Sequence, residues 1–380
     1  MDTMHLFALR WRMLRGKFHE HKKYWDPRRR AIYSKVILTK EQKEAVDRLY
    51  LTHYGKKVPY TWHRHYTAFS GKFDATYMPE LVYLPEFELY MNSDRNYIHT
   101  FSDKNVQPMI AAAAGVTMPR TILSCVEGVL RDQNGRFVSR DEVAAILGDR
   151  GDVFCKPSVG SNSGRGCCAA HFEKGIDTLS GSTVGQLLED MGRNFVIQER
   201  LRCHESIRAL HPDSVNTLRV MTYRWKNEIC HAPIIMRIGQ KGNVVDNGHA
   251  GGIFIAVDDD GTLHEKAFME FKQEFTSHPD THIPFAGYQV AGVPKILEAA
   301  IRVHQAVPQL GVVNWDFTLD EAGEPVLIEA NMKAGSVWSA QMTHGCGPFG
   351  ERTVEILEWL KFMRKTKNPE KYRFGNGMDT

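Results

Sequence analysis

Several signals of other protein classes are missing from this chain of 380 residues. Its seven cysteines are odd in number, include the adjacent pair Cys167 and Cys168, and form no Cys-x-x-Cys pair, which argues against a disulfide framework or a zinc site. No apolar run approaches the roughly 20 residues that a membrane span needs. The first residues also lack the long apolar core and the small-residue cleavage site of a signal peptide. We therefore expect a protein of the reduced, cytoplasmic compartment.

Charge is low overall but unevenly placed. The formal net charge is +3, yet the first thirty residues carry nine basic and three acidic side chains, a net +6 that leaves −3 for the remainder. Leu6, Leu9 and Met13, with arginines between them, fit a short basic amphipathic helix. Such a helix either touches an anionic membrane or docks on its own protein. The pattern matches no nucleic-acid motif, so we expect no nucleic-acid partner.

The length allows two or three domains, and a hydrophobic content of 42% is enough to bury a core. We divide the chain into four parts: a basic, aromatic-rich N-terminal region at 1–100, a mixed region of helices and short strands at 101–200, a region of long strands and helices at 201–355, and a basic helix and tail at 356–380. The expected class is α+β with mostly antiparallel sheets.

Capping residues mark several helices. Thr39 and Gln42 form a capping box, and the helical repeat that follows runs to Tyr54. Other helices are predicted at 104–114, at 139–148 with a Ser139–Glu142 cap, and at 352–363. His63 and His65 lie two residues apart, but no further ligand cluster accompanies them. We interpret them as packing or substrate-contact residues rather than metal ligands.

Two alternating segments, 314–319 and 325–331, are joined by a glycine-containing turn and predict a β-hairpin. On such a hairpin Asp316 can lie across from Glu329, and Asn331 falls on the same face as Glu329. Two carboxylates and an amide oxygen suit Mg²⁺, which prefers oxygen ligands and also binds substrate phosphates. The alternative is that these acids are only the solvent-facing positions of an amphipathic hairpin.

A second candidate site is the small-residue loop at 157–166, which lies between predicted strands at 153–156 and 167–172. Its glycines allow backbone N–H groups to close around phosphate oxygens, although a plain surface turn has a similar composition. The loop has no Gly-Lys-Ser/Thr ending and no following helix, and Lys156 precedes it, whereas a kinase lysine follows its glycine loop. Strand, lysine, glycine loop and antiparallel strand therefore indicate a hairpin that covers ATP phosphates.

In this order the motifs resemble those of the ATP-grasp superfamily, and in particular its sugar-transfer-associated branch, from about Asp103 to Glu351. The resemblance implies an ATP-grasp fold, in which two α+β subdomains clamp ATP and Mg²⁺. The first hundred residues do not resemble the parallel α/β domain with which a typical ATP-grasp ligase begins. Substrate identity is therefore left open.

The resemblance also implies residue roles. Phosphate contacts would come from Lys104, Lys156, Ser158, Gly160, Ser161, Gly164 and Gly166. The base would be bound by Gln198, Glu199 and Leu201, and the ribose by Glu205. Arg219 and Arg237 match the family's substrate or phosphate arginines, and Asp316, Glu329 and Asn331 match its magnesium ligands.

Some of these residues have simpler interpretations from the sequence. Arg219 could form only a cross-strand ion pair, and Arg237 could be a plain surface position. His249, in the polar loop at 246–252, suits a binding contact or a proton-transfer group.

The implied reaction is carboxylate–amine ligation through an acyl phosphate, with small-molecule or glycan substrates in sugar or surface-polysaccharide modification. Phosphate transfer to a hydroxyl is the alternative, and a non-catalytic nucleotide-binding protein is a more distant one. We expect Asp316→Asn and Glu329→Gln each to abolish turnover and to leave the fold intact.

Overall fold

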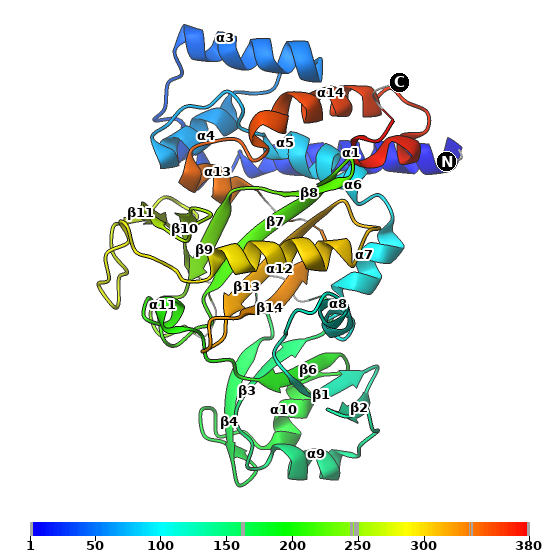
Figure 1. The fold of residues 1–380 in the computed structure, drawn as a ribbon, viewed down its shortest axis with the longest axis vertical. Helices are drawn as coiled ribbons and strands as arrows, with labels where there is room; N and C mark the ends of the chain where they lie inside the picture. The colour runs from blue at the N-terminus through cyan, green and yellow to red at the C-terminus, as the bar shows by residue number, and fades with distance from the viewer. Residues whose placement is uncertain are drawn as a thin grey trace.

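The structure is a computed structural model that describes residues 3–160, 164–243, 246, 251–333, 335 and 337–377. Three tiers follow one another along its long axis: a helical end, an eight-stranded sheet and a six-stranded sheet (Figure 1). In both sheets the neighbouring strands are antiparallel, which confirms the expected α+β class. None of the described helices combines the length and apolar character needed to cross a bilayer.

The first hundred residues form helices joined by loops, with no strand in their described part. Their α-helices are α1 (Thr3–Lys23), α2 (Pro27–Tyr33), α3 (Lys40–Leu49), α4 (Thr61–Ser70), α5 (Glu80–Val82), α6 (Leu89–Met91) and α7 (Arg95–Ser102). The predicted capping box of Thr39 and Gln42 opens α3, and the helix continues as a π-helical turn, Tyr50–Tyr54, before Gly55. Leu9 and Met13 on α1 are buried against the rest of the chain, so this part of the predicted apolar face docks on the protein itself.

His63 and His65 are buried inside the helical end and do not reach a surface. His63 packs edge-on against Tyr50 at 5.9 Å, and His65 packs against Phe69 at 5.3 Å, both between ring centroids. Burial lowers the pKa of His63 to about 4 and that of His65 to about 3, so both imidazoles are neutral near pH 7. The packing interpretation is confirmed for both residues.

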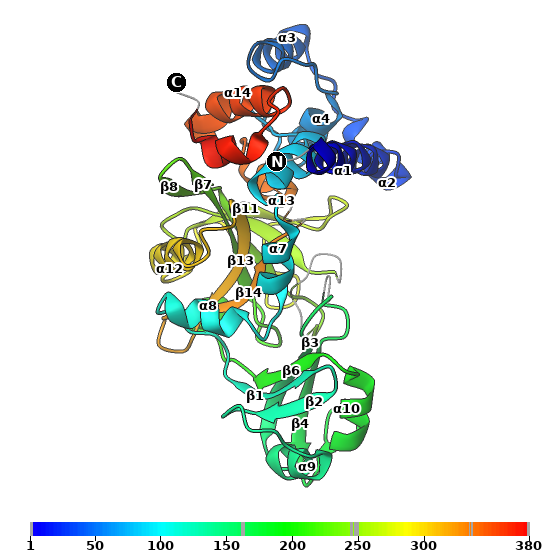
Figure 2. The same cartoon turned by 90° about the vertical axis from the view of Figure 1, so that its right-hand side faces the viewer.

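The six-stranded sheet has the order β2-β1-β6-β3-β4-β5. Its strands are β1 (Thr121–Val126), β2 (Val129–Asp132), β3 (Gly151–Pro157), β4 (Cys168–Glu173), β5 (Ile176–Asp177) and β6 (Phe195–Glu199). Helices α9 (Arg140–Leu147) and α10 (Val184–Met191) cover the sheet and share one apolar core with it (Figure 2). The predicted Ser139–Glu142 capping box opens α9, and the helix stops before Gly148 as expected.

The eight-stranded sheet has the order β12-β11-β10-β9-β7-β13-β14, with β8 paired to the second half of β7. Its strands are β7 (Thr217–Trp225), β8 (Glu228–His231), β9 (Ile234–Ile238), β10 (Ile253–Val257), β11 (Leu263–Phe268), β12 (Glu274–Phe275), β13 (Val312–Leu319) and β14 (Pro325–Asn331). Helix α12 (Val293–Gln305) covers one face of it and buries Ile296, Ala300 and Val303 there (Figure 1). The remaining helices are α8 (Gln107–Ala113), α11 (Glu205–Arg208), α13 (Trp338–His344) and α14 (Thr353–Met363), followed by a 3-10 segment, Pro369–Gly375.

The helical end is bonded directly to the β13–β14 hairpin. The Asn92 amide donates to Val312 O at 2.7 Å and to Met332 O at 3.0 Å, and its oxygen accepts from Gly311 N at 2.8 Å. The Glu88 carboxylate accepts from Gly335 N at 3.0 Å, just beyond β14. Residues before position 100 therefore hold the start of β13 and the chain just after β14. No sequence motif indicates this connection.

Candidate active site

The predicted register of the β13–β14 hairpin is confirmed, because Asp316 pairs with Glu329. The row continues across the sheet: Arg219 on β7 pairs with Asp316, and Thr217, two residues earlier on β7, pairs with Arg237 on β9. Alternating side chains of a strand point to the same face, so this register places five polar positions on one face of four adjacent strands. Sheet geometry alone thus gathers residues that lie more than a hundred positions apart in the chain.

Asp316 is the centre of this row and is only 2% exposed, so it is not the solvent-facing position of the simpler interpretation. Arg219 holds it with two hydrogen bonds of 2.8 and 2.9 Å, which is the cross-strand ion pair of the simpler interpretation, and Arg237 lies 3.1 Å from its Oδ2. The Asn331 amide donates to the same Oδ2 at 3.1 Å. Burial opposes the charge of Asp316, yet the two guanidinium groups outweigh it and hold its pKa below the ordinary value.

The second arginine is not a plain surface position, and that alternative is wrong. Arg237 is largely buried and donates to the Thr217 hydroxyl at 2.7 and 3.1 Å. It also lies 3.5 Å from Asp246, whose carboxylate accepts a hydrogen bond from Thr217. Burial raises the pKa of Asp246. Thr217 and Asp246 were not predicted, although Thr217 follows from the two-residue repeat that places it beside Arg219.

Two buried lysines approach the hairpin from the side of the six-stranded sheet. Lys104 Nζ lies 2.9 Å from Glu329, and Lys156 Nζ donates to Ile328 O at 3.3 Å. The helix that was predicted to start at Lys104 begins only at Gln107, and Lys104 lies in the turn before it. Its backbone N–H donates to Ser158 O at 3.0 Å, which ties this turn to the end of β3. The structure thereby brings both predicted phosphate lysines to the predicted metal hairpin.

The glycine loop leaves β3 beside these lysines. Gly164 and Gly166 have φ values of +73° and +75°, a left-handed backbone conformation that residues with a Cβ seldom adopt. The Ser158 hydroxyl is 1% exposed and has no hydrogen-bond partner among the described residues. A buried, unsatisfied hydroxyl costs folding free energy, so a ligand that accepts its hydrogen bond gains affinity. Gly160 has a φ of +70°, and Ser161 lies outside the described residues.

Ser158→Ala is expected to change folding and binding in opposite directions. Removing the unpaired hydroxyl should leave the free energy of unfolding unchanged or raise it by up to about 1 kcal/mol. Loss of a hydrogen bond to a charged phosphate should weaken ADP binding by roughly tenfold or more. Chemical denaturation and calorimetric titration with ADP measure the two effects.

Ser214→Ala is the matched control for this experiment. The Ser214 hydroxyl is also buried, but it donates to Asn216 Oδ1 at 2.7 Å. Its removal should cost about 1–2 kcal/mol of stability and leave ADP affinity unchanged. If Ser158→Ala behaves in the same way, the hydroxyl of Ser158 has a structural partner and not a ligand.

ADP affinity is expected to fall as pH rises through about 8. Burial lowers the pKa of Lys156 from 10.5 to about 8, and bound phosphates would stabilise its charged form. Binding therefore takes up a proton above this pH, and affinity for Mg²⁺-free ADP should fall by about tenfold per pH unit. Lys156→Arg keeps its charge and should flatten this part of the profile, whereas an unchanged slope in the variant would assign the titration to another group.

The lowered pKa of Lys156 affects the stability of the fold in the opposite direction when no nucleotide is added. Between pH 8 and 10.5 the unfolded chain holds a proton that the folded Lys156 has lost, so stability should rise with pH over this window. Denaturation midpoints of the wild type and of Lys156→Arg, measured at several pH values, separate this effect from other titrations.

The residues predicted to bind base and ribose lie apart from this charged cluster in their described contacts. Gln198 donates to Pro119 O at 3.1 Å. Glu199 forms ion pairs of 2.6 and 2.7 Å with two arginines, Arg120 and Arg150, which directly precede strands of the six-stranded sheet. Leu201 follows β6 and is half-buried, and Glu205 begins α11, where it is exposed and paired with Arg208. Their roles stay predictions. His249 lies outside the described residues.

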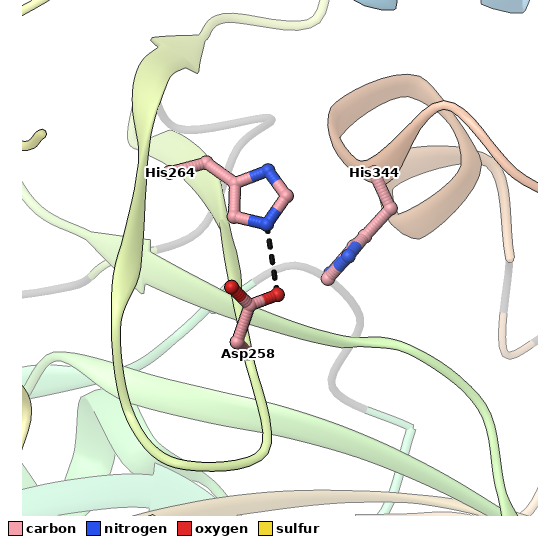
Figure 3. A group of neighbouring side chains, drawn as sticks. All are labelled: Asp258, His264 and His344. Atoms are coloured by element: carbon pink, nitrogen blue, oxygen red, sulfur yellow. Dashed lines mark hydrogen bonds and ion pairs between the residues drawn. The ribbon is translucent and has the colours of Figure 1, made fainter. Parts of the chain in front are cut away.

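A separate polar triad joins the β10–β11 hairpin to the end of α13 (Figure 3). His264 Nε2 lies 2.9 Å from Asp258, and His344 Nε2 donates to Ile234 O at 2.7 Å. Two ring nitrogens are thus already engaged in hydrogen bonds with protein oxygens. We interpret the triad as a structural contact that holds α13 against the edge of the sheet.

The donor set of the main cluster fits Mg²⁺. Asp316, Glu329 and Asn331 supply two carboxylates and an amide oxygen from facing strands, and these are oxygen ligands of the kind that the ion prefers. The lysines and arginines around them suit the phosphates of a nucleotide. The cluster can therefore hold a metal–phosphate complex between the two sheets.

Comparison with known proteins gives one extended match. A family model described as sugar-transfer associated ATP-grasp covers residues 85–355. No curated protein sequence matches the chain.

Solved structures give weaker likenesses. N5-carboxyaminoimidazole synthase from Aspergillus clavatus, in complex with ADP and 5-aminoimidazole ribonucleotide, is 13% identical over 63% of this chain and 47% of its own, with a TM-score of 0.36. An L-amino acid ligase from Bacillus licheniformis is 12% identical over 66% and 44%, with a TM-score of 0.37. The VanG D-Ala:D-Ser ligase from Enterococcus faecalis is 12% identical over 69% and 62%, with a TM-score of 0.39. The chain spans less than half the length of the first two proteins, and TM-scores below 0.5 do not bear on its function.

Proposed function

Because this chain belongs to the sugar-transfer-associated ATP-grasp family, we propose that it is an ATP- and Mg²⁺-dependent ligase that joins a carboxylate to an amine. One observation carries the proposal: Lys104 and Lys156 meet the Asp316–Glu329 hairpin at the junction of the two sheets. This arrangement supplies cations for a triphosphate and oxygen ligands for its metal within one cluster.

In the structure these charges neutralise one another. Lys104 pairs with Glu329, and the two arginines pair with Asp316. Entry of a nucleotide would give the lysines new partners in its phosphates and free the Glu329 carboxylate as a metal ligand. Bound Mg²⁺ would supply Lewis-acid polarisation of the phosphoryl oxygens. The ion pairs thus compensate the buried cations and carboxylates with one another.

Arg219 and Arg237 support an anionic acceptor. Their guanidinium groups match the planar geometry of a carboxylate and of a phosphate. An oxygen of the substrate carboxylate would attack the γ-phosphorus and form an acyl phosphate, while the bond to the β-phosphate oxygen breaks and ADP leaves. An amine nitrogen would then attack the acyl carbon and displace inorganic phosphate. The proton lost by the amine would pass to His249 or to bulk water, and His249 could equally serve as a binding contact.

We further propose that the acid and the amine are small molecules or groups on a glycan, in sugar or surface-polysaccharide modification. The support is the association of the family with sugar transfer. The family model begins at residue 85, so the helices before it are candidates for a substrate-specific part of the chain.

The deciding experiment follows ADP and free phosphate together, with ATP, Mg²⁺ and pooled carboxylates and amines. Equal, substrate-dependent release of both products by the wild type, absent in Glu329→Gln, would support the ligase. Glu324→Gln, at the exposed turn of the same hairpin, is the control for a change of charge alone. ADP without free phosphate would instead mean transfer to a hydroxyl. ADP binding without any turnover would favour a non-catalytic role.

A further inference from the structure

Helix α1 carries a second apolar face that the protein does not cover. Its large apolar side chains at positions 4, 7, 11, 14 and 18 are Met4, Phe7, Trp11, Leu14 and Phe18, and each is between 55% and 80% exposed. Single exposed apolar residues are common, but a continuous row of this kind marks an interaction surface. We call these five residues, together with Trp25, the α1 stripe.

The spacing of the α1 stripe places it on one line along the helix. Intervals of three and four residues keep side chains on one face, because an α-helix has 3.6 residues per turn. Leu9 and Met13 lie on the opposite face and are buried in the protein. Trp25, 59% exposed in the turn after α1, continues the row and packs edge-on against Phe18 at 6.4 Å. The helix is about 30 Å long at 1.5 Å per residue.

Positive charge flanks the α1 stripe, and the acids in the described part of this segment are buried or paired. Arg10, Arg15 and Lys22 are exposed basic side chains of α1. Within residues 3–30, the acids are Glu20, which is buried, and Asp26, which is held by Arg28 in an ion pair of 2.8 Å. An aromatic apolar row with basic flanks is the pattern of a helix that lies in the interface of an anionic bilayer.

We propose that the α1 stripe docks this protein on the surface of an anionic membrane. The apolar side chains would enter the boundary between headgroups and acyl chains, while the flanking basic groups contact lipid phosphates and carboxylates. A second copy of the chain is the competing occupant. Pairing two α1 helices would bring their arginines and lysines together without exposed acids to compensate them. The charge pattern therefore favours lipid.

The position of α1 in the molecule is compatible with this contact. It lies in the helical end, far from the six-stranded sheet with its glycine loop (Figure 2). Docking through the α1 stripe leaves that sheet and the charged cluster facing the aqueous phase. The proposal does not depend on the ligase activity, because it concerns a separate surface.

Vesicle binding by the full chain tests the proposal. Co-sedimentation is measured with phosphatidylcholine vesicles and with vesicles of equal parts phosphatidylcholine and phosphatidylserine, at low and high salt. We expect binding to the anionic vesicles, weakened by salt, and little binding to the neutral ones. Phe7→Ser combined with Trp11→Ser should weaken binding by roughly a hundredfold, since each buried large apolar side chain contributes on the order of tenfold.

Ile37→Ser is the matched control. Ile37 is 85% exposed and lies between α2 and α3, outside the α1 stripe, so its loss should leave vesicle binding unchanged. Arg10→Glu combined with Arg15→Glu should reduce binding to anionic vesicles alone, which tests the charge contribution separately.

Three results would overturn the proposal: no binding of the wild type to anionic vesicles, equal binding by the Phe7/Trp11 variant, or equal loss in the Ile37 variant. Sedimentation equilibrium tests whether a second copy of the chain occupies the α1 stripe. A wild-type dimer that the Phe7/Trp11 variant cannot form, without vesicle binding by either protein, would assign the stripe to a second copy.

Discussion

Glu329→Gln is expected to lower the rate of ATP turnover by three orders of magnitude or more, about 4 kcal/mol of transition-state stabilisation. The substitution removes the charge of a proposed metal ligand and keeps the shape of the side chain. Glu329 is partly exposed, and glutamine retains an oxygen that can accept a hydrogen bond from Lys104. The free energy of unfolding should therefore change by about 1 kcal/mol or less.

Steady-state ADP release, thermal unfolding and ADP titration measure this prediction together. Nucleotide affinity without Mg²⁺ should stay close to that of the wild type, because the proposed phosphate contacts come from the lysines and the glycine loop. Wild-type turnover in Glu329→Gln would remove this residue from the proposed metal site. A variant that has lost its cooperative unfolding transition would leave the rate uninterpretable, and Glu329→Asp would then be measured in its place.

Asp316→Asn is expected to abolish turnover and also to destabilise the protein by about 3–5 kcal/mol. Asp316 is 2% exposed and neutralises both Arg219 and Arg237. Without its charge, two buried guanidinium groups lose their principal counter-ion. The structure thus revises the sequence-based expectation that this substitution leaves the fold intact.

Comparison with Glu329→Gln separates the loss of a carboxylate charge from the loss of the counter-ion of two buried arginines. Both variants remove one carboxylate charge from the same hairpin, but only Asp316 is enclosed by arginines. Denaturation without nucleotide should show a clearly lower midpoint for Asp316→Asn than for Glu329→Gln. Equal midpoints would mean that the Asp316 cluster contributes nothing to folding, and Arg219 would then be available to substrate at no cost in stability.

The sequence predicted those parts of the site that depend on local patterns. Alternation within 314–319 and 325–331 determines which side chains share a face, so the pairing of Asp316 with Glu329 could be predicted and is confirmed. Capping boxes at Thr39 and Ser139 are equally local and are confirmed. The strand and helix patterns predicted the fold class. The order of the lysine, glycine-loop, arginine and acid motifs resembled the ATP-grasp family, and the family model confirms that resemblance. The four-part division of the chain stays a prediction.

Contacts between distant segments could not be predicted in this way. Asp246 reaches Arg237 from a loop, and only the folded sheet shows that the two groups are neighbours. Helix α1 has apolar residues on two faces, so its sequence alone does not say which face is buried. Leu9 and Met13 turned out to pack inward, which leaves the aromatic face outside. Helical periodicity shows which residues share a face, but tertiary packing determines which face is buried.

The bonding of the N-terminal helices to the β13–β14 hairpin has a consequence for synthesis of the chain. Asn92 and Glu88 take their partners from residues 311–335, and Leu9 and Met13 share a core with Ile356 and Trp359. A ribosome delivers these partners only after more than two hundred further residues, at about 5–20 residues per second. The aromatic helices at the start of the chain must therefore wait many seconds with apolar surface uncovered. The N-terminal helices can therefore complete their contacts only after β13, β14 and α14 have been synthesised.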